Sequence, residues 1–152
     1  MNVTTKEMGL LKDMQAQEKL CIKKYDSYAS SACSEELRGL LHGIADVERE
    51  HLQTVSAMMT GEVKPVSGSG STGGSGAKPC KVSYSSEDDK SRDAFLCNDL
   101  LTTEKHVSAL YNTGIFEFSD AQARNVLNHI QKEEQQHGLS LYEFMSANGM
   151  TP

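Results

Sequence analysis

The stretch Glu134-Gln135-Gln136-His137 decides the fold, together with a second copy of its pattern, Glu48-Arg49-Glu50-His51, in the first half of the chain. In each copy a glutamate and a histidine stand three residues apart, so both side chains lie on one helical face and can bind one ion or two adjacent ones. A further glutamate, Glu18 or Glu104, precedes each copy by the same number of residues. Four glutamates and two histidines in two equal sets are the ligands of a carboxylate-bridged two-metal site.

The interval between the glutamates of each set predicts a helical hairpin. The midpoint between Glu18 and Glu48 is Cys33, in a polar stretch typical of a turn, and the midpoint of the second set is Ser119. A helix rises by about 1.5 Å per residue, so glutamates equally far before and after a turn lie at the same depth in a helix pair. The two glutamates of each set can therefore face each other across their hairpin.

Apolar residues return every three or four positions along four stretches, as amphipathic helices require. The first expected helix covers residues 4–32, and the second runs from Ser34, its N-cap, to about residue 60. The third begins between residues 86 and 91 and ends near 118; the fourth runs from a capping box of Ser119 and Gln122 to just before Gly149. All the glutamates and histidines of the two sets fall on the apolar stripes of these helices.

Residues 61–85 include a glycine- and serine-rich stretch that predicts a flexible crossover. Its random-coil span is roughly 28 Å, and a helix of about 27 residues is about 40 Å long, so a stretched crossover can run the length of the helices. The 152 residues fit one domain, 1–152, with hairpin one at 4–60 and hairpin two at 86–148. The predicted fold is all-α: a ferritin-like four-helix bundle of two antiparallel hairpins joined by one long crossover.

Buried carboxylates without partners repel one another and must take up protons, whereas two divalent cations balance the charge of four glutamates. The alternative, ordinary solvated helix residues, does not account for the apolar stripes or the equal spacing. We therefore predict a metal pair with Glu48 and Glu134 as bridges, Glu18 and Glu104 as terminal ligands, and one histidine, His51 or His137, on each ion. This set of ligands suits iron first and manganese second, with zinc as an adventitious occupant.

Tyr25 and Tyr111 each follow a ligand glutamate by two helical turns, on the same face. Two interpretations are open for them. They pack as core aromatics, or each phenol donates a hydrogen bond to a ligand carboxylate across the bundle and orients it.

Composition excludes several classes of protein. A net charge of −6 and the lack of any basic run argue against a nucleic-acid partner. No apolar run is long enough for a membrane span, and the N-terminus lacks the apolar core of a signal peptide, so we expect cytoplasmic synthesis. The four cysteines form no C-x-x-C pair, which excludes a zinc ribbon or a rubredoxin-type site, and we expect them to stay reduced.

The second hairpin resembles the spore coat protein F family of endospore-forming bacteria, over about residues 90–150. The stretches that carry the resemblance are Asn98–Val107, Tyr111–Phe118 and Leu127–Gly138. The first hairpin is similar in layout and looser in sequence. That family belongs to the ferritin-like superfamily, with the rubrerythrins, bacterioferritins and manganese catalases, whose metal ligands match the six positions. The resemblance implies localisation in the spore coat, with other coat proteins as partners.

Three functions are compatible with this pattern. The first, which we favour, is a coat-associated protein that binds a metal pair. The second is a di-iron or di-manganese oxidoreductase that acts on O₂ or peroxide and is peroxidase-, ferroxidase- or catalase-like. The third is a purely structural coat protein whose metal ions only stabilise the bundle. The oligomeric state is open, with a homodimer as one alternative.

Overall fold

The computed structural model describes residues 1–66 and 80–150. These residues form four helices: α1 (Thr5–Ser31), α2 (Glu35–Met59), α3 (Glu87–Glu117) and α4 (Ala121–Ala147). The prediction of an all-α four-helix bundle is confirmed. The predicted flexible crossover falls largely on residues 67–79, which lie outside the described residues, while its described ends, 61–66 and 80–85, are non-helical as expected.

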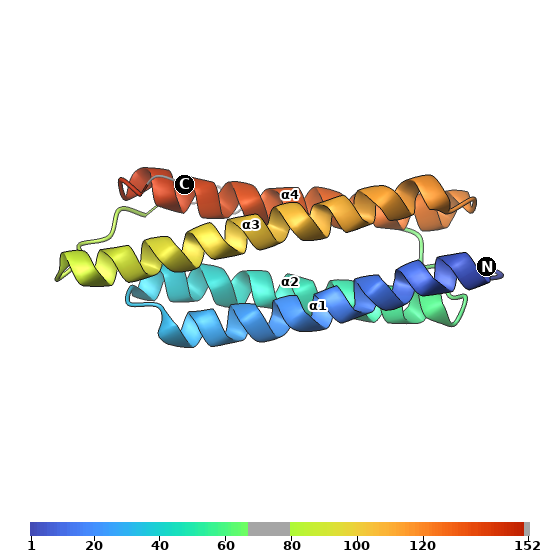
Figure 1. The fold of residues 1–152 in the computed structure, drawn as a ribbon, viewed down its shortest axis with the longest axis horizontal. Helices are drawn as coiled ribbons and strands as arrows, with labels where there is room; N and C mark the ends of the chain where they lie inside the picture. Colours follow the sequence, from blue (N-terminus) through green and yellow to red (C-terminus); the bar gives the residue numbers. More distant parts are fainter. Residues whose placement is uncertain (67–79, 151–152) are drawn as a thin grey trace.

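The helices pair in chain order into two hairpins that lie against each other (Figure 1). Across the bundle α1 packs on α3 and α2 packs on α4. The two described ends of the crossover are held at opposite ends of the bundle. The carbonyl of Gly61 accepts a hydrogen bond from the N-terminal amino group at 2.9 Å, and the carbonyl of Cys80 accepts one from Asn148 Nδ2 at 3.0 Å. The crossover therefore joins opposite ends of the bundle.

Each helix begins at a side chain that accepts a hydrogen bond from the first turn, namely Thr4, Ser34, Ser86 and Asp120. The N-cap of α4 differs from the prediction, because Asp120 Oδ1 accepts from the N–H of Ala123 at 2.8 Å. The predicted capping box of Ser119 and Gln122 is therefore wrong. A carboxylate at the positive end of a helix is a stronger acceptor than a serine hydroxyl, so the cap forms one residue later.

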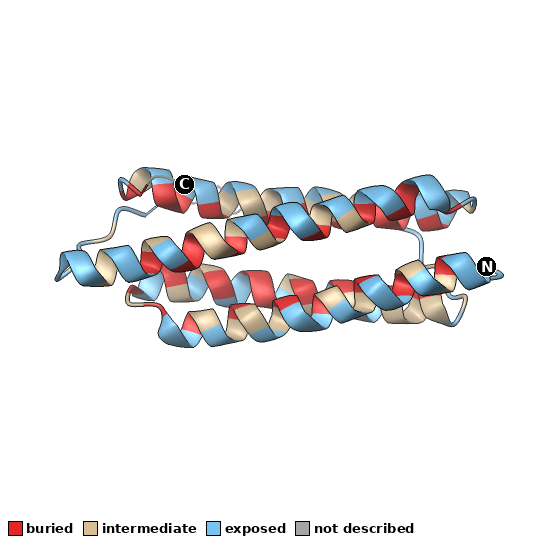
Figure 2. Cartoon of the chain, viewed as in Figure 1, coloured by how far each residue is buried: buried red, intermediate tan, exposed pale blue. Residues whose placement is uncertain are grey.

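The buried faces of all four helices point into one shared core (Figure 2). Leucines at equivalent positions of the two hairpins, Leu41 and Leu127, are fully buried. Burial of each such side chain contributes about 1.5–3 kcal/mol to folding. The same faces carry the six predicted metal ligands, so the core that holds the bundle together also positions the site.

Two acids, one in each hairpin, lie at the turn of the opposite hairpin. Asp93 of α3 is fully buried and accepts hydrogen bonds from the backbone N–H groups of Cys33 and Ser34, at 2.7 and 3.0 Å, in the turn between α1 and α2. Glu7 of α1 takes the equivalent position in the repeat. The backbone N–H of Thr4 lowers the pKa of Glu7 most, and the backbone N–H of Ser119, in the turn between α3 and α4, lowers it further. Asp93 therefore ties the turn between α1 and α2 to hairpin two, and Glu7 lies close to the turn between α3 and α4.

Candidate metal centre

The six predicted ligands meet in the middle of the core, although they come from four different helices. α1 contributes Glu18 and α3 contributes Glu104, while α2 and α4 each contribute a glutamate and a histidine one turn apart. All six side chains are buried, and Glu18, Glu48 and Glu134 have no exposed surface. The helical periodicity that hides apolar residues therefore hides these polar residues as well.

The six residues form two groups that could each hold one metal ion. The first group is Glu18, Glu48, His51 and Glu134, and the second is Glu48, Glu104, Glu134 and His137; within each group the ligand atoms lie within 4.8 Å of one another. Glu48 and Glu134 belong to both groups. This is the placement that bridging carboxylates require, with Glu18 and Glu104 at the two ends. Metal binding by these residues stays a prediction.

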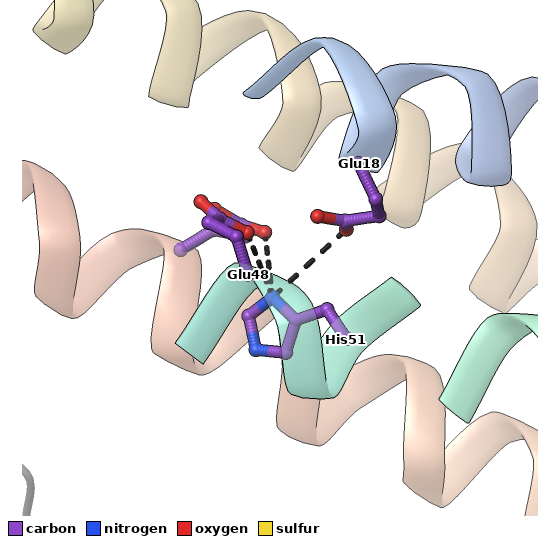
Figure 3. Close-up of side chains that lie close together, drawn as sticks. Glu18, Glu48 and His51 are labelled. Atoms are coloured by element: carbon purple, nitrogen blue, oxygen red, sulfur yellow. Dashed lines mark hydrogen bonds and ion pairs between the residues drawn. The ribbon is translucent and has the colours of Figure 1, made fainter. Parts of the chain in front are cut away.

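Both imidazoles point their Nδ1 atoms at the shared carboxylates. Figure 3 shows His51 turned toward Glu48 and Glu18, with Nδ1 at 3.0 Å from Glu48 Oε2 and 3.9 Å from Glu18 Oε1. The same atom lies 3.1 Å from Glu134 Oε1. His137 Nδ1 lies 3.3 Å from Glu48 Oε1 and 3.5 Å from Glu134 Oε2. Each bridging glutamate therefore presents one oxygen to each histidine.

Protons balance the charge of this cluster in the absence of metal. Burial, followed by the charges of Glu48 and Glu134, raises the pKa of Glu18 to about 10. Burial also raises the pKa of Glu104 well above its ordinary value. Burial acts in the same direction on Glu48 and Glu134, but their contacts with the two histidines and the terminal glutamates outweigh it and lower both pKa values.

The histidines carry the remaining protons. Burial by itself lowers the pKa of an imidazole, but the carboxylates around His51 and His137 outweigh that effect and raise both pKa values well above the ordinary range. These shifts favour the neutral form of Glu18 and Glu104, the ionised form of Glu48 and Glu134, and the cationic form of both histidines. A cluster with that distribution carries no net charge, and two divalent ions with four ionised glutamates and neutral histidines would carry none either.

The cluster leaves polar atoms without hydrogen-bond partners. In residues 1–66 and 80–150, the buried side-chain atoms that form no hydrogen bond are Glu18 Oε2, Glu48 Oε1, Glu104 Oε2, Glu134 Oε2 and His137 Nδ1. All of them belong to the six predicted ligands. His137 Nδ1 has only ion-pair contacts, the shortest at 3.3 Å to Glu48 Oε1 and 3.5 Å to Glu134 Oε2. Oxygen and imidazole nitrogen donors gathered in one place, and unsatisfied by protein, fit a pair of hard or borderline metal ions.

The two tyrosines hold the terminal glutamates from the opposite hairpin. Tyr25 of α1 donates a hydrogen bond to Glu104 Oε1 of α3, and Tyr111 of α3 donates one to Glu18 Oε1 of α1. The contact across the bundle, one of the two interpretations open from the sequence, is therefore present. Each phenol fixes one oxygen of a terminal glutamate and leaves the other, Oε2, facing the cluster without a partner.

Glu133 is a residue of the site that the sequence did not indicate. Its Oε2 atom lies 2.7 Å from Nε2 of His51, and its Oε1 atom lies 3.3 Å from Nε2 of His129 on the surface of α4. A carboxylate on the outer nitrogen of a ligand histidine fixes the ring and makes it a better donor. The repeat gave no signal for Glu133, because Val47 takes the equivalent position in hairpin one. Through Glu133, His129 on the surface of α4 is connected to His51.

The four cysteines all lie among the described residues, and no two of them form a disulfide. Cys21 and Cys97 are buried, Cys33 is half-buried and Cys80 is exposed. Burial, followed by the charge of Glu48, raises the pKa of the Cys21 thiol. A thiol held in its neutral form is a poor metal ligand, so the cluster remains one of carboxylates and imidazoles.

Comparison with known proteins gives one family match. Residues 92–152 match the Coat F domain, a segment that holds Glu104, Tyr111, Glu134 and His137. No curated protein and no solved structure gives a significant match. The match confirms the resemblance of the second hairpin and points to association with the spore coat. Among the residues described, no helix has the length and apolar character that a membrane crossing requires.

Proposed function

Since residues 92–152 form a Coat F domain, we propose that this protein is a component of the spore coat that binds a carboxylate-bridged metal pair in a ferritin-like bundle. Iron is the first candidate and manganese the second. The observation that carries the proposal is the cluster of five buried, unpaired polar atoms on the six predicted ligands. Other coat proteins are the proposed partners.

The chain's own residues explain how such a pair would be held. Glu48 and Glu134 would each contribute to both metal positions. One histidine and one terminal glutamate would complete the ligands of each position. The phenols of Tyr25 and Tyr111 keep the terminal carboxylates in place, and Glu133 does the same for His51. Two divalent ions would supply positive charge, and for iron or manganese a change of valence, in a core from which water is excluded.

Metal content is the direct test of this proposal. Protein purified from its own host and analysed for its elements should contain two iron or manganese atoms per chain. We also expect a higher melting temperature for the loaded protein than for the chelator-treated protein, because ions that bind only the folded state stabilise it. The proposal would be wrong if the purified protein contained no metal and gained no thermal stability when Fe²⁺ or Mn²⁺ was added. The glutamates would then be protonated residues of a metal-free core.

An oxidoreductase is the second candidate, favoured by the pocket that reaches His137 from the surface. A metal pair that only stabilised the bundle would need no such opening. The discriminating measurement is anaerobic loading with Fe²⁺ followed by peroxide. Oxidation well above the rate of free Fe²⁺ supports an enzyme, whereas background oxidation with a raised melting temperature supports a structural role.

A further inference from the structure

The two helices that carry the histidines leave space between them. α2 and α4 pack against each other less closely than the helices within each hairpin. Two pockets lie along this seam, one beside His137 and one beside His51, and Glu133 lines both. The pocket beside His51 is bordered by crossover residues Lys64–Val66. The pocket beside His137, which we call the His137 pocket, is lined by α2 and α4 alone.

The surroundings of the two ligand histidines differ on the side away from the glutamate cluster. His51 has its Nε2 atom bound by Glu133 at 2.7 Å. On the other side of the site the equivalent position is Val47, which lines the His137 pocket and provides no acceptor. His137 is also the more exposed of the two, at 7% against 2%. The repeat therefore gives two equal sets of ligands but two different surroundings.

Two glycines keep the His137 pocket wide. Gly39 and Gly43 lie one turn apart on α2 and both line the pocket, whose volume is about 280 Å³. A Cβ atom added at either position would meet nothing within 4 Å, so neither close packing nor the backbone requires glycine here. Glycine within a helix costs about 1 kcal/mol relative to alanine. The equivalent positions in hairpin two carry Asn125 and His129.

The remaining lining indicates what could enter. Leu40, Ile44 and Val47 form an apolar wall, and Gln136 and Ser140 provide an amide and a hydroxyl. At the inner end lies His137, whose Nδ1 atom is buried and unpaired among the ligand carboxylates. The lining also includes the carboxylate of Glu133, and a pocket of this size suits a small polar molecule better than a large organic one.

We propose that the His137 pocket is the entry route and binding site for a small oxygen-donor ligand of the peroxide class, which approaches the proposed metal position from the side of His137. This inference rests on the proposed metal centre. The proposal predicts that side chains filling the His137 pocket slow the entry of small molecules to the metal position, while all six predicted metal ligands stay in place.

The test uses the double variant Gly39→Leu/Gly43→Leu, with Gly9→Leu on α1 as the matched control. All three positions are helical glycines with open space around the added Cβ, so the substitutions raise helix propensity and the variants should fold. In metal-free protein, dissolved O₂ should relax the ring protons of His137 more than those of His51. We expect this relaxation to fall by about half or more in the double variant and to stay unchanged in Gly9→Leu, with exposed His106 as the internal reference.

The second measurement uses protein loaded with Co²⁺, with azide as the probe. We expect the rate of azide binding, followed in the visible spectrum of Co²⁺, to fall by about tenfold or more in the double variant while the Co²⁺ content stays the same. Unchanged O₂ relaxation at His137 together with unchanged azide binding would overturn the entry route. A wild-type protein that binds no Co²⁺ would instead overturn the metal centre, and the entry proposal with it, even if O₂ reaches His137.

Discussion

Replacing Glu48 by alanine should remove both metal ions, not one. Glu48 belongs to both ligand groups, with Oε2 at 3.0 Å from His51 Nδ1 and Oε1 at 3.3 Å from His137 Nδ1. Its loss takes one carboxylate from each position and one negative charge from the pair. Glu18, in contrast, belongs to the first group only. We therefore expect metal content to fall from two ions per chain to background in Glu48→Ala, and to about one in Glu18→Ala.

The measurement is elemental analysis after loading and gel filtration, with circular dichroism to check the fold. Glu50→Ala is the matched control, because Glu50 lies on the exposed face of the same helix. Glu48→Gln keeps the shape of the side chain and removes only its charge, so it covers the case in which the alanine variant unfolds. Full metal content in a folded Glu48→Gln or Glu48→Ala protein would show that Glu48 is not a bridge.

Metal affinity should rise steeply with pH. The raised pKa values of Glu18, Glu104, His51 and His137 mean that all four hold protons at neutral pH in the metal-free protein. Metal needs these groups deprotonated, so loading two ions releases up to four protons, and lowering the pH opposes loading. Each released proton changes the binding constant about tenfold per pH unit. The overall constant for the pair should therefore rise by up to about 10⁴ from pH 6 to pH 7.

Competition with a chelator at several pH values measures this slope, and calorimetry in buffers of different ionisation enthalpy counts the protons directly. Glu18→Gln is the informative variant, because it should bind only the ion held by Glu104 and His137, so loading should release about two protons in place of four. An overall constant that does not change between pH 6 and pH 8 would contradict the protonated, charge-balanced core described above.

Sequence patterns within single helices and hairpins predicted much of this structure. The positions of Glu18, Glu48, Glu104 and Glu134 predicted both hairpin turns, because helical rise converts sequence intervals into depth. The same periodicity predicted that His51 and His137 would be buried, and they are. These features depend on residues within one helix or one hairpin, which is the range over which a sequence pattern acts directly.

Several features that depend on contacts between the hairpins could not be decided from the sequence. Tyr25 could have packed as an ordinary aromatic, and only the position of α3 beside α1 brings its hydroxyl to Glu104. Glu133 breaks the repeat, so a comparison of the two halves passes over it. The N-cap of α4 lies one residue later than predicted because two capping side chains, Ser119 and Asp120, stand next to each other, and the carboxylate of Asp120 is the stronger acceptor at the positive end of the helix.

Asp93, which reaches into the turn of the opposite hairpin, has a consequence for how the chain folds. Without α3, the backbone N–H groups of Cys33 and Ser34 lose the carboxylate of Asp93. Hairpin one alone therefore leaves part of its own turn without hydrogen-bond partners. The repeat is visible in the sequence, but the cooperative unit is the whole bundle: cutting the crossover should give two fragments that are unstable apart and that recover order by associating.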